Sequence, residues 1–149
     1  MDTDNIIAIE NPKHVLAASE YAGQIYYKGI LYPAEQFIKL LVGSARHQIL
    51  LYDHAISLSV LELLDCHKDG IRPIVYVKYF PGPLSSVISD FNQSHRAIPV
   101  GLSKGVEDRL LVVDDVIFQF DTSLKDISGR LCVFMRIHEP FSSQIISKL

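Results

Sequence analysis

Short apolar runs alternate with amphipathic stretches through the middle of this chain. The run at 48–53 ends in a carboxylate and has the length of a buried strand, and 71–79 is a second run of this kind. Apolar residues at helical spacing predict three helices. The first begins at Pro33, the second follows Ser57 as its N-cap residue, and the third follows the turn at 81–83. Strands that alternate with helices in this way indicate an α/β fold.

Each helical segment carries a stripe that we expect to face the core. Gly70 is expected to end the second helix, because a glycine next to charged residues is a common helix stop. The predicted core-facing residues are Phe37, Leu40, Leu41 and Ala45 in the first helix, Val60, Leu61 and Leu64 in the second, and Leu84, Val87, Ile88 and Phe91 in the third.

The last third of the chain is dominated by strand patterns. Segments 109–113 and 116–120 flank Asp114 and Asp115, which predicts a β-hairpin. Further predicted elements are a strand or hairpin over 24–31, strands over 97–101 and 131–137, and a final helix from Pro140 with Ile145 and Ile146 buried. We therefore predict one domain over 24–149, a mixed sheet flanked by helices on both faces.

Composition and charge narrow the class of protein. The 149 residues are 48% apolar and 21% charged, which is typical of a globular domain. A net charge of −3 gives no overall electrostatic case for nucleic-acid binding. Segment 1–23 is a lead-in in which Asn11 and Pro12 begin a short helix; its acidic start does not resemble a secretory signal, and no apolar run approaches the ~20 residues of a membrane span. We expect a cytoplasmic protein with Cys66 and Cys132 as buried free thiols.

The segment from Glu107 to Asp126, EDRLLVVDDVIFQFDTSLKD, carries the candidate chemistry. This segment and the run YYKGILYPAEQFIKLLVGSARHQILLYDHAISLSVLELL resemble a compact phospholipase-D-like domain. Within that superfamily the chain is most similar to the small C-terminal domains of bacterial and phage antirepressor-like DNA-binding proteins. The similarity covers residues 26–149, and its most specific piece is Ser-Leu-Lys-Asp at 123–126.

The resemblance assigns roles to positions in this motif. The nucleophilic histidine of the family falls at Glu107 and its phosphate-binding cation at Arg109. Its structural aspartate falls at Asp114, the glycine of its turn at Asp121, and its phosphate-holding serine at Ser123, beside Lys125. The chain therefore departs from the family pattern at Glu107 and Asp121.

These two departures remove the chemistry that the family uses. The family reaction employs imidazole as the nucleophile on phosphorus and a second imidazole as the acid, and single-motif chains dimerise to bring the two together. A glutamate with a pKa near ~4.3 is an anion at neutral pH and repels a phosphodiester. Asp121 adds negative charge and removes the close backbone approach that glycine allows. The sequence thus predicts a motif without catalytic residues, with no metal or cofactor site.

Another histidine is a possible replacement for the missing nucleophile. His54 is the best candidate, as general base or nucleophile, because it follows the 48–53 strand at the end where α/β proteins place functional groups. His47, His95, His67 and His138 have the character of surface positions. Asp53 either caps the next helix or ties down the loop. Arg109, Ser123 and Lys125 are candidates for binding a phosphate; alternatively the charged groups form internal ion pairs, such as Arg109 with Glu107 or with an aspartate across the hairpin.

Three functions remain open from the sequence. The leading hypothesis is a catalytically degenerate phospholipase-D-like domain that acts as a homodimerisation or partner-binding module, with the motif buried at a two-fold axis. The second is a divergent phosphodiesterase or nuclease acting on DNA or RNA through His54. The third is a nucleic-acid-binding accessory protein of a mobile element or defence locus, although the aromatic clusters at 26–28 and 78–80 are expected to pack mainly in the core.

Overall fold

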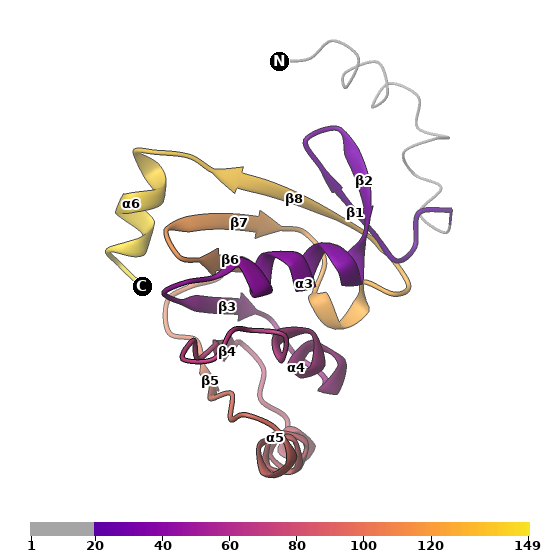
Figure 1. Ribbon diagram of the computed structural model, residues 1–149, viewed down its shortest axis with the longest axis vertical. Coiled ribbons are helices and arrows are strands. Elements are labelled where there is room, and N and C mark those ends of the chain that lie inside the picture. The colour runs from indigo at the N-terminus through magenta and orange to yellow at the C-terminus, as the bar shows by residue number, and fades with distance from the viewer. Residues whose placement is uncertain (1–19) are drawn as a thin grey trace.

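An eight-stranded sheet forms the centre of the molecule (Figure 1). This computed structural model describes residues 20–149, so the helix predicted at Asn11 and Pro12 lies outside the described residues. The elements are β1 (Gln24–Tyr27), β2 (Ile30–Pro33), α3 (Ala34–Ser44), β3 (Ile49–Asp53), α4 (Leu58–Leu64), β4 (Ile74–Val77), α5 (Gly82–Ser94), β5 (Val100–Leu102), β6 (Leu110–Val113), β7 (Val116–Phe120), the 3-10 turn η1 (Leu124–Asp126), β8 (Leu131–Ile137) and α6 (Phe141–Ile146).

The strand order is β2-β1-β8-β7-β6-β3-β4-β5. Strands β3, β4 and β5 are parallel to one another, while β6, β7 and β8 form an antiparallel meander joined to β3. β1 is parallel to β8 and antiparallel to β2. The predicted α/β class and mixed sheet are therefore confirmed, as are the hairpin at 114–115 and the late strand at 131–137.

The two faces of the sheet are covered very unequally. Helices α3, α4 and α5 bury their apolar sides against one face, where they form the larger core cluster. On the other face, Ile145 and Ile146 of the short helix α6 pack on a smaller cluster that contains Tyr52, Val112 and Ile117. Among residues 20–149 the predicted helices are present on both faces, but the second face carries only the six-residue helix α6.

Several local predictions were wrong. Leu40 is 75% exposed, because α3 turns Phe37, Ile38 and Val42 toward the sheet. Helix α4 ends at Leu64, well before Gly70, which has a positive φ of 82° in a later turn. Ser57 occupies the N-cap position of α4, but its hydroxyl contacts Ser59 and does not cap the backbone.

The two cysteines also differ from each other. Cys132 is buried, and burial raises the pKa of its thiol to about 12, so it is an inert core residue. Cys66 is exposed, which contradicts the prediction that both thiols are buried. The thiol of Cys66 contacts the carbonyl of Leu63 at the end of α4.

Candidate functional site

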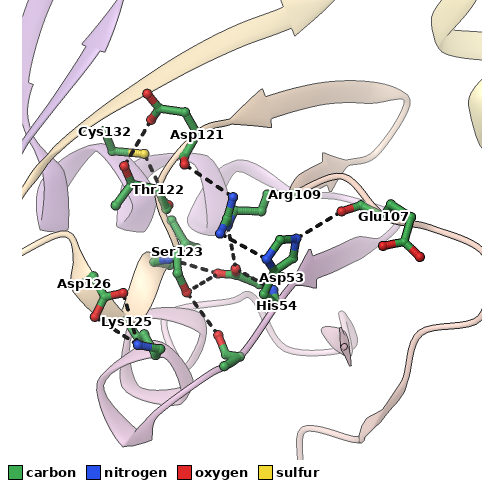
Figure 2. A network of polar contacts seen from close by, with 12 residues as sticks. Asp53, His54, Glu107, Arg109, Asp121, Thr122, Ser123, Lys125, Asp126 and Cys132 are labelled. Atoms are coloured by element: carbon green, nitrogen blue, oxygen red, sulfur yellow. Dashed lines mark hydrogen bonds and ion pairs between the residues drawn. The ribbon is translucent and has the colours of Figure 1, made fainter. Parts of the chain in front are cut away.

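The register between β3 and β6 brings the predicted site residues together. The two strands are antiparallel, with Tyr52 opposite Leu110. The residues that follow β3 and those that precede β6 therefore meet at the same end of the strands. Asp53 and His54 therefore approach Arg109 although 55 residues separate His54 from Arg109 in the sequence. Figure 2 shows this group of side chains.

Asp53 is the buried centre of the group. Its carboxylate accepts hydrogen bonds from the Ser123 hydroxyl (3.1 Å), from the Leu124 backbone N–H (2.9 Å) and from the His54 backbone N–H (2.7 Å). Burial raises the pKa of Asp53, and these hydrogen bonds together with the charge of Arg109 only partly oppose the effect. Of the two roles proposed for Asp53, the structure therefore supports the tying of loops, here to the start of η1.

Arg109 lies between this buried carboxylate and the open cleft. Its Nε is 3.3 Å from Asp53 Oδ1, an ion-pair contact in which the N–H is not directed at the oxygen. One terminal nitrogen donates to the Asp121 carbonyl (3.3 Å), and the other contacts Nδ1 of His54 (3.1 Å). With 25% of its side chain exposed, Arg109 is largely enclosed by protein, and two of its five N–H donors make hydrogen bonds to protein groups.

The contacts of His54 fix the position of its proton. A guanidinium can only donate hydrogen bonds, so Nδ1 of His54 must be the acceptor in its contact with Arg109. The proton of the neutral ring is then on Nε2, which lies 3.1 Å from the Glu107 carbonyl and donates to it. Both ring nitrogens are engaged, and neither presents a free lone pair to a substrate.

The Glu107 carboxylate is turned away from Arg109. It accepts a hydrogen bond from Lys78 Nζ at 2.6 Å, and this contact lowers the pKa of Glu107. The pairing of Arg109 with Glu107 that the sequence suggested is therefore wrong. Both Glu107 and Lys78 are exposed, so the pair lies at the surface of the site.

Asp121 is engaged with strand β8. Its Oδ1 accepts from the Val133 backbone N–H (2.8 Å) and from the Thr122 hydroxyl (3.2 Å). Its backbone N–H donates to the Val133 carbonyl (3.3 Å). The carboxylate thus extends the pairing of β7 with β8.

The three candidate phosphate-binding residues do not form one cluster. The Ser123 hydroxyl is buried and bonds to Asp53 and to the Ala55 carbonyl. Lys125 pairs with Asp126 (3.0 Å) and lines a separate hollow between α3, α4 and η1, whereas Arg109 lines the cleft near His54. In Figure 2, Lys125 and Glu107 lie on opposite sides of Arg109.

Asp114 lies at the other end of β6, in the turn of the hairpin. Its carboxylate accepts from the backbone N–H groups of Arg46, His47 and Gln48 at 2.7–3.2 Å, and its φ of 57° is left-handed. Partial burial opposes ionisation, but these three hydrogen bonds outweigh it and lower the pKa of Asp114. Its contacts are those of a structural residue that joins the hairpin to the loop before β3.

An open cleft of about 520 Å³ borders Arg109 and His54. Its charged lining is acidic, with Glu107, Asp108 and Asp121 against the single guanidinium of Arg109. Its apolar lining comes from β7 and β8, and Met135 is 61% exposed there. The cleft therefore combines negative charge with an accessible apolar strip.

Some residues of this region were placed wrongly or missed from the sequence. Tyr79 is 59% exposed and Phe80 37% exposed, so these two aromatics do not pack in the core. Lys78 was not identified as the partner of Glu107. It directly follows β4, which is parallel to β3, and so it lies at the same carboxyl end of the strands as His54. Elsewhere, His67 is buried and not a surface residue, and its Nδ1 contacts the Lys68 carbonyl.

Comparisons with known proteins give one distant structural match of note. Neither the protein-family models nor the curated proteins contain a match to the sequence. The fold is similar to a solved structure of TrmBL2, described as an archaeal chromatin protein with a novel mode of DNA binding, with a TM-score of 0.47 and 17% identity. The match covers 76% of this chain and 45% of that one. No helix among residues 20–149 is long and apolar enough to cross a membrane.

Proposed function

We propose that this chain is a non-catalytic phospholipase-D-like domain that binds another protein through the cleft beside Arg109. The observation that carries the proposal is that the polar groups of the site are bonded to one another. Arg109 contacts Asp53, His54 and the Asp121 carbonyl, and Glu107 pairs with Lys78. A nucleophile needs a free lone pair aimed at its substrate, and the ring of His54 offers none in this arrangement.

The lining of the cleft favours a partner of a particular chemistry. Glu107 is paired with Lys78, and Asp108 and Asp121 remain against the single guanidinium of Arg109, so the lining keeps a small excess of negative charge that disfavours a polyanion and favours lysine or arginine side chains. Exposed Met135 offers a flexible apolar contact of a type common in protein-binding surfaces. We therefore expect the partner to present a segment in which basic and apolar side chains are mixed.

The loss of catalysis is tested by assaying the native chain beside Glu107→His. Bis(p-nitrophenyl) phosphate, single-stranded DNA and duplex DNA serve as substrates. The native protein is expected to give no turnover above buffer, because no imidazole is free to attack phosphorus. Turnover by the native chain that His54→Gln abolishes would overturn the proposal and favour a divergent phosphodiesterase.

The binding role is tested by a photo-crosslinking amino acid placed at Met135 in the source cells. The matched control places it at Leu40, which is 75% exposed and belongs to α3, on the opposite face of the sheet. A discrete adduct with another protein is expected at position 135 and not at 40, and Asp121→Lys combined with Asp108→Lys should remove it. Equal labelling at both positions would contradict a cleft-specific partner.

Nucleic-acid binding is a second candidate because of one observation. Tyr79 and Phe80 are exposed next to Lys78, and Lys78 Nζ lies 6.0 Å from the centre of the Tyr79 ring. An exposed aromatic beside a cation can stack on an unpaired base. Fluorescence anisotropy with a labelled single-stranded oligonucleotide tests this candidate. Binding that weakens at least tenfold in Tyr79→Ser and falls with added salt would favour it over the protein-binding role.

A further inference from the structure

The two edges of the sheet differ in how well they are protected. At the β2 edge, Lys28 and Gly29 (φ 51° and 79°) form the tight turn of the β1–β2 hairpin. Antiparallel alternation turns the backbone groups of Ile30 and Tyr32 toward β1, and those of Leu31 and Pro33 outward. Because proline has no N–H, this edge offers a single outward donor, and it is poorly suited to pair with another strand.

The β5 edge, at the other side of the sheet, is only three residues long but has neither a proline nor a charged side chain among them (Figure 1). Val75 N–H donates to the Pro99 carbonyl (3.0 Å), and Ser103 N–H donates to the Val77 carbonyl (2.8 Å). Alternate residues of a parallel strand face its neighbour, so Val100 and Leu102 turn both their N–H and C=O groups outward. Each of these residues therefore offers a donor and an acceptor on the open side.

The side chains of this edge also suit close approach of another strand. Leu102 is 58% exposed and Val100 is half-buried, while Gly101 between them has no side chain. A Cβ added at Gly101 would meet nothing within 4 Å. The edge thus has an apolar residue on each side of an open central position.

We propose that β5 pairs antiparallel with β5 of a second copy of this chain. The partial charges along the edge are self-complementary: Val100 of one copy lies opposite Leu102 of the other, and each such pair exchanges two hydrogen bonds. The two Gly101 residues face each other on the two-fold axis, and each exposed Leu102 packs against Val100 across the interface. The pairing joins the two sheets into one.

A second copy fits this edge because the residue on the two-fold axis, Gly101, has open space around it, and because its neighbours Val100 and Leu102 then meet each other as apolar pairs. The pairing lies three strands away from β6, in the order β6-β3-β4-β5, and leaves the cleft beside Arg109 available to its partner. The inference goes beyond the proposed function, because it does not depend on what the cleft binds.

Disulfide trapping tests the pairing and its register. Facing residues of this kind have Cα atoms about 4.5 Å apart, which lies within the range of about 4.4–6.8 Å that a disulfide spans. In a Cys66→Ser background, Gly101→Cys is expected to form a covalent dimer under mild oxidation, seen on a non-reducing gel. Leu31→Cys, at the protected β2 edge, is the matched control and is expected to stay monomeric. Equal crosslinking of the two variants would overturn the register.

Sedimentation equilibrium of the native chain tests the pairing without a crosslink. Leu102→Pro removes an outward N–H and no hydrogen bond to β4, and it is expected to raise the dimer dissociation constant at least tenfold. Leu102→Lys retains the N–H but places a charge at the interface, and it is also expected to weaken the dimer. It serves as the test variant if Leu102→Pro fails to fold. A native chain that is monomeric throughout, or dimers undiminished in the folded variants, would overturn the proposal. Asp108→Lys with Asp121→Lys should leave the dimer intact, so failure of the cleft function is distinguishable from failure of the pairing.

Discussion

The polar network around Arg109 has a buried half and an exposed half. In the buried half, the Asp53 side chain has no exposed surface and holds Ser123, Leu124 and Arg109. In the exposed half, Glu107 and Lys78 pair at 2.6 Å with 72% and 41% of their side chains exposed. The shorter contact is the less important one for stability, because solvent screens it and would replace it on rupture. Glu107 thus lies where we expect a substitution to have little effect on folding.

The largest expected effect comes from removing the buried carboxylate. Asp53→Ala leaves the Leu124 N–H without its acceptor and Arg109 without its counter-charge, and the Ser123 hydroxyl keeps only its contact with the Ala55 carbonyl. We expect a loss of about 3–5 kcal/mol in the free energy of unfolding, measured by urea denaturation. Asp126→Ala, at an exposed lysine pair, is the control and should change the midpoint little. A loss below about 1 kcal/mol for Asp53→Ala would remove the distinction between the two halves.

A smaller effect is expected at the hairpin. Asp114→Ala removes the acceptor of three backbone N–H groups in the loop before β3 and places alanine at a left-handed φ. We expect a loss of about 1–3 kcal/mol. Asp114→Asn retains an acceptor and tolerates this φ, so it should lose less. If the two variants are equally stable in urea, the hydrogen bonds of Asp114 do not support the hairpin.

Lowering the pH should change the contributions of Asp53 and Asp114 to the free energy of unfolding in opposite directions. The pKa of Asp114 is lowered in the fold, so its contribution to stability is present above the unfolded pKa of about 3.9 and is lost as the pH falls through the folded value. The pKa of Asp53 is raised, so its contribution is present below the unfolded pKa and is lost as the pH rises through the folded value. Carbon-13 NMR of the carboxyl groups should find Asp53 titrating at a higher pH than Asp114. The reverse order would contradict the burial of Asp53.

The smallest effect is expected in the exposed half. Glu107→Gln removes the ion pair with Lys78 but leaves the Glu107 carbonyl, which accepts the proton of His54, in place. The thermal midpoint should therefore equal that of the native chain within error. A clear drop in the midpoint would mean that the pair of Glu107 with Lys78 supports the fold.

The sequence predicted elements better than it predicted where they end. Short apolar runs located β3, the β6–β7 hairpin and β8; the pattern is strongest in β3 and β6, which are buried on both faces. The sequence pattern placed the end of α4 at Gly70, whereas the helix ends at Leu64. It also placed Leu40 on the buried face of α3, whereas this side chain is exposed. Helix ends and the rotation of a helix about its axis depend on tertiary packing, which a local pattern does not contain.

The site was predicted in part for a similar reason. Arg109 and His54 were singled out, and the structure places them in contact. The bond from Ser123 to Asp53 spans 70 residues and depends on the register of β3 with β6, which the sequence did not reveal. The pairing of Glu107 with Lys78 depends in the same way on β4 lying beside β3.

The central claim, that the polar groups of the site are occupied by one another, is tested most directly at the ring of His54. Long-range proton–nitrogen NMR at neutral pH distinguishes the two neutral tautomers, and His54→Gln identifies the signal among the six histidines. We predict the Nε2–H form, with Nδ1 accepting from Arg109, and a shift of the tautomer population in Arg109→Ala. A predominant Nδ1–H form, or a population that Arg109→Ala leaves unchanged, would contradict the account.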